Sequence, residues 1–126
     1  MNFDSEITIH NQWRSRIAEF IKAPDGSINV ADLGSDRVCD LGRWLYGEGA
    51  KWSSSPEYAA LRFEHARFHQ AAARVVATRQ RGERVFEQIA LGAGSEFADS
   101  LAAIERAIAK VRLRLTNNAE AVGAKR

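Results

Sequence analysis

Apolar residues in the C-terminal third of the chain recur at steps of four and three, and this spacing constrains the fold more than any other feature. The residues that carry it are Phe97, Leu101, Ile104, Ile108, Val111 and Leu115. Such steps place side chains on one face of an α-helix, so they predict a helix over 95–115 that is buried along one seam. Ser95, preceded by Gly94, is a suitable N-cap. No stretch alternates β-branched and polar residues at a period of two, so we expect no sheet.

Three further segments have helical patterns. The first is expected over 4–23 and is ended by Pro24, Asp25 and Gly26. A long helix over 55–80 begins with a capping box formed by Ser54 and Glu57, and Pro56 suits its first turn. A shorter helix within 82–94 should turn four residues inward, namely Val85, Phe86, Ile89 and Ala90. We therefore predict an all-α fold, an antiparallel four-helix bundle with a short extra helical segment that carries the cysteine.

The composition indicates one globular domain over residues 1–126. Of the 126 residues 45% are hydrophobic and 27% are charged, which is enough for a buried core, expected over 5–116 with a flexible tail at 117–126. No apolar run approaches the ~18 residues of a membrane span, and the N-terminus lacks the pattern of a signal peptide, so we expect a cytoplasmic protein without a membrane partner. The net charge of +2, with acidic and basic residues interspersed, argues against a nucleic-acid partner.

The only cysteine, Cys39, opens an unusual segment at residues 38–49. Glycines at 42, 47 and 49 break any long helix there, while Leu41, Trp44, Leu45 and Tyr46 provide apolar surface that holds the segment against the rest of the fold. A single cysteine has no partner for an internal disulfide, so its thiol is free, metal-bound or reactive.

All three histidines lie on the inward stripes of predicted helices. His65 and His69 are four residues apart on one helical face, the spacing by which one helix supplies two ligands to one metal ion, and His10 has a similar place on the first helix. Taken singly, each histidine is more often a core residue and the cysteine a small buried hydrophobe. Together, three imidazoles and one thiolate make a complete tetrahedral set of ligands for zinc. Binding of the metal would remove the free-energy cost of burying imidazoles without partners.

Three short blocks of the sequence resemble the signature blocks of the chemoreceptor zinc-binding domain family. They contain His10 and Trp13; Cys39, Leu41, Gly42 and Trp44; and His65 and His69. The resemblance spans about residues 6–116. It implies a helical bundle with one Zn²⁺ held by His10, Cys39, His65 and His69, a homodimer, and a regulatory role beside chemoreceptor or diguanylate cyclase domains. It also implies that Cys39 is redox-reactive and reports zinc or oxidants such as hypochlorous acid.

Nothing in the chain resembles a chemoreceptor hairpin or a nucleotide cyclase, so we expect a stand-alone member that signals to a partner protein in trans, in chemotaxis or cyclic-di-GMP control. A zinc-stabilised dimeric adaptor without a sensing role is the alternative. We do not expect an enzyme, because four protein ligands fill the zinc shell, whereas catalytic zinc keeps one position open for water or substrate.

Overall fold

The computed structural model describes the backbone of residues 1–124 and the side-chain surroundings of residues 1–116. Every regular element in the described part is helical, which confirms the all-α prediction. Three long helices run along the molecule: α1 (Phe3–Lys22), α4 (Pro56–Gln80) and α6 (Glu96–Ala124). Between them lie short elements, namely α2 (Val30–Gly34), α3 (Asp40–Tyr46), the 3₁₀ helix η1 (Glu48–Trp52) and α5 (Glu87–Leu91).

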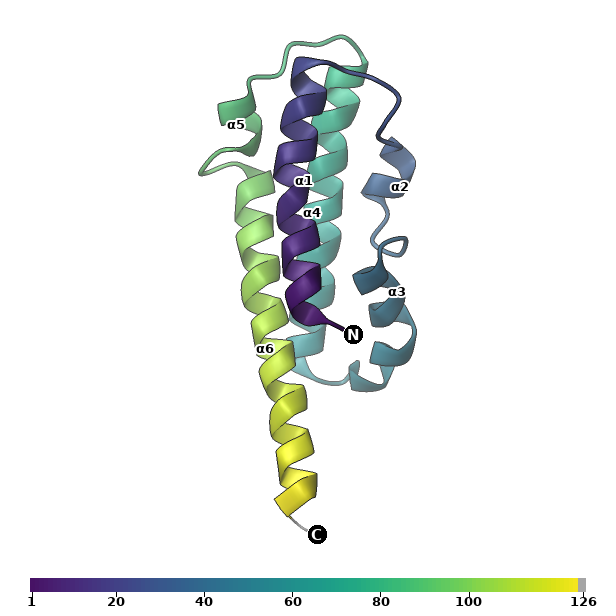
Figure 1. Ribbon diagram of the computed structural model, residues 1–126, viewed down its shortest axis with the longest axis vertical. Helices are drawn as coiled ribbons and strands as arrows, with labels where there is room; N and C mark the ends of the chain where they lie inside the picture. Colours follow the sequence, from purple (N-terminus) through teal and green to yellow (C-terminus); the bar gives the residue numbers. More distant parts are fainter. Residues whose placement is uncertain (125–126) are drawn as a thin grey trace.

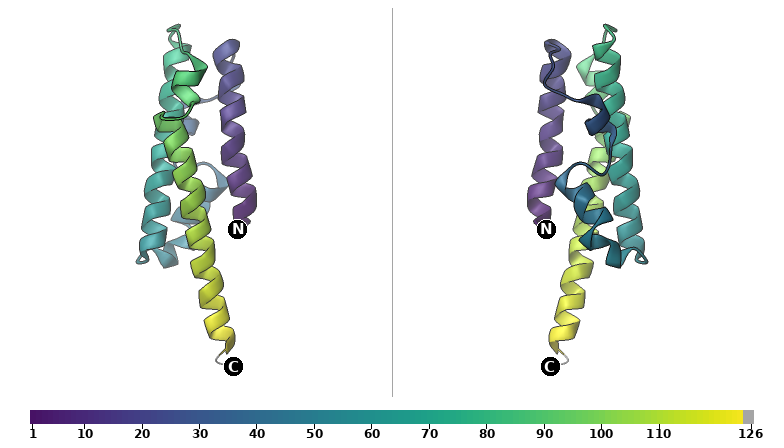
Figure 2. Two further views of the ribbon diagram at one scale, coloured as in Figure 1. Left: turned by 90° about the vertical axis from the view of Figure 1, so that its left-hand side faces the viewer. Right: turned by 90° about the vertical axis from the view of Figure 1, so that its right-hand side faces the viewer.

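The three long helices pack side by side, with α1 and α4 parallel and α6 running in the opposite direction (Figures 1 and 2). The chain descends from the end of α1 to the start of α4 through α2, α3 and η1, which line the right-hand side of Figure 1. The predicted antiparallel four-helix bundle is not confirmed, because α1 and α4 run in the same direction and the fourth predicted helix, within 82–94, is only the five-residue α5. The segment between α1 and α4 is broken into α2, α3 and η1, and we call it the broken segment. That broken segment carries Cys39.

Local sequence signals fix the starts of the long helices. The hydroxyl of Ser55 accepts a hydrogen bond from the Tyr58 N–H at 3.1 Å and caps α4, one residue later than the predicted Ser54, and Pro56 is the first helical residue. The hydroxyl of Ser95 accepts from the Ala98 N–H at 3.0 Å, which confirms the predicted cap of α6. Helix α6 continues to Ala124 rather than ending near residue 115; residues 125–126 of the expected flexible tail lie outside the described residues.

The apolar stripe of α6 forms one side of the core. Five of its six predicted residues are buried, and Leu115 is partly buried. They pack against buried residues of α1 and α4, which are Ile17, Phe20, Leu61, Phe68, Ala72 and Val76. The Phe68 and Phe97 rings lie 5.3 Å apart between their centroids and join α4 to α6. The core thus fixes the two helices that carry the histidines.

The predicted inward face of residues 82–94 was wrong for Phe86 and Ile89, whereas Val85 and Ala90 are partly buried against the core. Phe86 and Ile89 are 58% and 76% exposed, whereas Leu91 is buried. Helix α5 has only five residues, so it presents little more than one turn to the bundle and has no sustained stripe. Its position is held by the Leu91 carbonyl, which accepts a hydrogen bond from the Arg14 guanidinium at 2.9 Å. In the described part of the chain, no helix combines the length and apolar character needed to cross a bilayer.

Candidate metal centre

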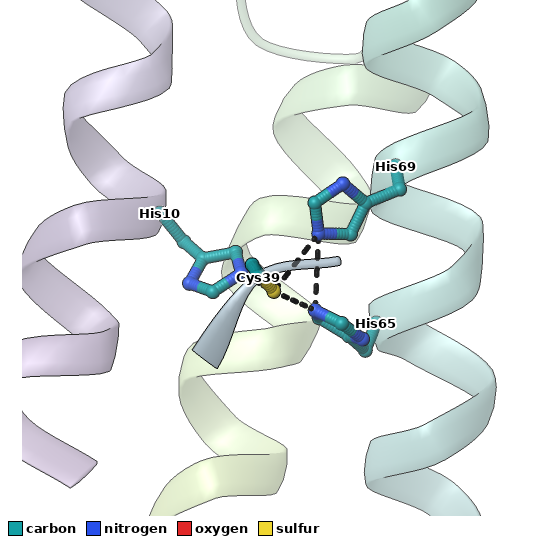
Figure 3. Close-up of side chains that lie close together, drawn as sticks. All are labelled: His10, Cys39, His65 and His69. Atoms are coloured by element: carbon teal, nitrogen blue, oxygen red, sulfur yellow. Dashed lines mark hydrogen bonds between the residues drawn. The ribbon is translucent and has the colours of Figure 1, made fainter. Parts of the chain in front are cut away.

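The four predicted ligands come from three separate parts of the fold and meet at one point (Figure 3). His10 projects from α1, and His65 and His69 project from successive turns of α4. Cys39 is the N-cap of α3 and reaches the site from the broken segment. The parallel packing of α1 beside α4 brings the three imidazoles together, which confirms the expectation that these two helices are neighbours.

The distances between the four ligand atoms fit one tetrahedral ion. The Cys39 Sγ lies 3.2 Å from the Nε2 of His65, 3.6 Å from that of His69 and 3.8 Å from that of His10, and the two α4 Nε2 atoms are 3.0 Å apart. Zinc bonds of about 2.0–2.1 Å to nitrogen and about 2.3 Å to sulfur place tetrahedral ligands about 3.3–3.6 Å from one another. All four atoms lie within 4.8 Å of each other, so the residues present fit a zinc ion.

Backbone carbonyls orient two of the three imidazole rings. The Nδ1–H of His10 donates to the Glu6 carbonyl at 2.7 Å, and the Nδ1–H of His69 donates to the Leu33 carbonyl at 2.7 Å. A proton on Nδ1 leaves the Nε2 lone pair free, and such outer hydrogen bonds are the usual support of metal-bound histidines. The Nδ1 of His65 is buried and has no partner among the described residues.

The site is built for a cation rather than for internal hydrogen bonds. Burial lowers the pKa of His10 to about 4 and lowers the pKa values of His65 and His69 as well, so all three imidazoles are neutral at pH 7. Burial raises the pKa of the Cys39 thiol, which therefore carries a single proton for three surrounding nitrogens. A metal ion satisfies all these lone pairs at once, and it displaces the thiol proton.

Close backbone packing holds the Cys39 segment in place. The Gly42 N–H points at the Cys39 Sγ from 3.4 Å, and Leu41 and Leu45 are fully buried. A Cβ on Gly42 would overlap the Asp36 carbonyl group, whose carbon would be only 2.8 Å away. The Trp44 ring packs edge-on against Phe3 with their centroids 5.3 Å apart. Of the four motif residues predicted to support the site, Gly42 contacts the thiol, while Leu41 and Trp44 pack the segment that carries it.

Two tyrosines tie the Cys39 segment to α4. The Tyr46 hydroxyl donates to the Asp36 carboxylate at 2.5 Å and accepts from the Arg62 guanidinium at 3.1 Å. The buried Tyr58 hydroxyl donates to the Leu45 carbonyl. The Asp36 carboxylate is thus hydrogen-bonded to Tyr46 and not to an imidazole.

Sequence reasoning missed Glu6, whose carboxylate is buried beside the site. Its side chain is 4% exposed, and its Oε1 has no hydrogen-bond partner in the described structure. Burial raises the pKa of Glu6, and the charge of Asp40 raises it further. Glu6 lies one helical turn before His10, and that spacing was the signal available in the sequence. The fourth predicted support, Trp13, is partly buried and lies beneath the Arg16 guanidinium at 3.9 Å from the ring centroid.

Comparison with known families agrees with this geometry. A family model described as the chemoreceptor zinc-binding domain matches residues 10–76, a segment that contains all four predicted ligands and more than half of the chain. No curated protein and no solved structure matched the chain. The chain therefore belongs to the chemoreceptor zinc-binding domain family, and zinc is the metal that the site takes.

Proposed function

We propose that the chain is a sensory domain in which zinc-bound Cys39 reports oxidants such as hypochlorous acid, or the availability of zinc itself, to a signalling partner. One observation carries this proposal, the unequal support of the four ligands. The three histidines are almost fully buried on long helices, whereas Cys39 is partly exposed on a seven-residue helix. The ligand with the weakest structural support is also the one with redox chemistry.

The chemistry of such a response starts at the Cys39 sulfur. Bound zinc supplies a positive charge that keeps the buried thiol deprotonated at neutral pH although burial raises its pKa. The thiolate sulfur attacks the chlorine of hypochlorous acid, an S–Cl bond forms, and hydroxide leaves. Water then displaces chloride from sulfur with loss of a proton, which leaves a sulfenic acid. A sulfenic acid is no longer a thiolate, so Cys39 ceases to be a strong ligand while the three imidazoles stay in place.

Loss of the Cys39 bond should loosen residues 36–49 without melting the bundle. The segment is short and glycine-rich, so it has little helix propensity of its own, whereas α6 is held by its buried stripe. Movement of the segment would expose Leu45 and more of Trp44, which now packs on Phe3. These apolar side chains would form a new surface that a partner protein recognises.

The proposal extends to the partner and the assembly, and membership of the family supports both. We propose a homodimer in the cytoplasm that acts on a chemoreceptor or diguanylate cyclase pathway in trans and has no catalytic activity of its own. Sedimentation at micromolar concentration tests the dimer, and a single 14.0 kDa species would contradict it.

A zinc-stabilised dimeric adaptor without a sensing role is the second candidate. The observation that favours it is the closed ligand set, in which three of the four residues are buried and one ion joins α1, α4 and the broken segment. Such a site suits a structural zinc ion. The two candidates differ in one property, the response of residues 36–49 to oxidation of Cys39.

Hydrogen exchange separates the two candidates. Zinc-loaded protein is measured before and after a stoichiometric dose of hypochlorous acid, with Cys39→Ser as the control that lacks the reactive sulfur. A sensor should release zinc and lose amide protection over 36–49, while protection over 96–115 is unchanged. If mass spectrometry shows oxidised Cys39 and protection over 36–49 is the same as before, the adaptor is the better account.

A further inference from the structure

A cleft of about 270 Å³ reaches the metal centre from the surface between α1 and α2. Cys39 and the nearly buried His69 lie at its inner end, and the buried side chain of Ile28 forms part of its wall together with Trp13. Arg16, Asp32 and Val38 line it at exposed positions. A water molecule occupies about 30 Å³ in the liquid, so the cleft has room for a small molecule beside the thiol.

We infer that this cleft is the route by which small molecules reach the Cys39 sulfur. The inference rests on the proposed function in so far as Cys39 is the reactive group there. Other atoms close to the sulfur belong to buried residues, namely the N–H of Gly42 and the Nε2 atoms of His10 and His65. A larger cavity of about 440 Å³ beside Tyr46 and Arg62 is lined by none of the four ligands.

Alkylation by iodoacetamide, a small neutral reagent, tests the inference. The thiolate sulfur forms a bond to carbon as iodide leaves. Zinc-loaded protein is treated with the reagent, and intact mass gives the rate of modification of Cys39.

Cleft-blocking variants test the route itself. Val38→Trp, at an exposed position on the cleft, should slow iodoacetamide about tenfold, equivalent to about 1.4 kcal/mol of barrier. Ala59→Trp is the matched control, because Ala59 is exposed and lines the larger cavity instead. It should leave the rate unchanged. Zinc content and circular dichroism establish that each variant is folded, and Ser27→Trp, in the loop along the same cleft, replaces Val38→Trp if that variant fails to fold.

Two results would overturn the inference. One is equal slowing by Val38→Trp and Ala59→Trp. The other is a rate that reaches a plateau with iodoacetamide concentration, because reaction would then be limited by opening of residues 36–49. Alkylation requires no oxidant, so this failure is distinct from failure of the proposed function: hypochlorous acid would still release zinc if the sensor proposal holds and only the route is wrong.

Discussion

Gly42→Ala should weaken zinc binding although Gly42 is not a ligand. A Cβ at this position would lie 2.8 Å from the Asp36 carbonyl carbon and 3.0 Å from the Arg37 Cα, both of which are backbone atoms. Gly42 is buried, and the atoms nearest to the new methyl group belong to the backbone. No flexible side chain can therefore move aside to make room. The backbone between Asp36 and Gly42 must move, and Cys39 lies within that stretch.

The size of the effect follows from the overlap. Forcing an extra carbon into a packed site costs about 1–3 kcal/mol. If about 2 kcal/mol of this is relieved when Cys39 leaves its position, zinc binds about thirtyfold more weakly. Competitive titration against a chelator of known affinity measures the change, and circular dichroism should show that the helical content is retained because α1, α4 and α6 do not depend on this contact.

The matched control is Gly26→Ala. Gly26 lies in the loop after α1, and a Cβ added there would have no atom within 4 Å, so the zinc affinity of this variant should equal that of the wild type. If Gly42→Ala also binds zinc as tightly as the wild type, the close approach of Gly42 to Asp36 does not position Cys39.

Three further predictions concern the stability of the fold. Tyr58→Phe removes the donor to the buried Leu45 carbonyl and should cost about 1–3 kcal/mol in urea unfolding of the zinc-loaded protein; an unchanged midpoint would refute this role. Ile108→Ala, at a fully buried position, should cost about 2–5 kcal/mol yet leave zinc stoichiometry at its wild-type value, and loss of zinc from the folded variant would contradict the separation of core and site. In zinc-free protein, folding lowers the pKa of His10 from 6.5 to about 4, so His10 is protonated in the unfolded state at a higher pH than in the folded state. The free energy of unfolding should therefore fall by about 3 kcal/mol from His10 alone as the pH decreases from 6.5 to 4. Unfolding that does not depend on pH over this range would count against the prediction.

The sequence predicted those parts of the fold that depend on interactions between residues close together in the chain. Helices α1, α4 and α6 follow from apolar periodicity and from caps such as Ser95. The three histidines were chosen as ligands from their helical positions, and Cys39 because it is the only thiol. Three successive serines precede Pro56, and all of them are good caps. Residue type alone therefore did not distinguish Ser54 from Ser55 as the cap of α4.

The parts that the sequence did not predict depend on tertiary structure. Helix α2 was not predicted because five residues are too few for a periodic pattern, and the carbonyl of its Leu33 orients His69 through a backbone atom that every residue type possesses. Phe86 and Ile89 were expected inside because they are apolar, but a one-turn helix cannot bury all such residues. Glu6 was missed because a glutamate is rarely buried, and only the packed structure shows that this one is.

The order of the ligands along the chain has a consequence for how the protein assembles. His65 and His69 are one turn apart, whereas 26 residues separate Cys39 from His65 and 29 separate His10 from Cys39. Closing each of these loops costs on the order of 3 kcal/mol of chain entropy. In a refolding chain, His65 and His69 should therefore bind zinc first, and Cys39 and His10 should bind it afterwards. We expect two phases of zinc uptake in a stopped-flow experiment. A single phase would mean that the bundle forms before the metal binds. In a chain whose single cysteine has no partner for an internal disulfide, the metal is the reversible cross-link between distant segments.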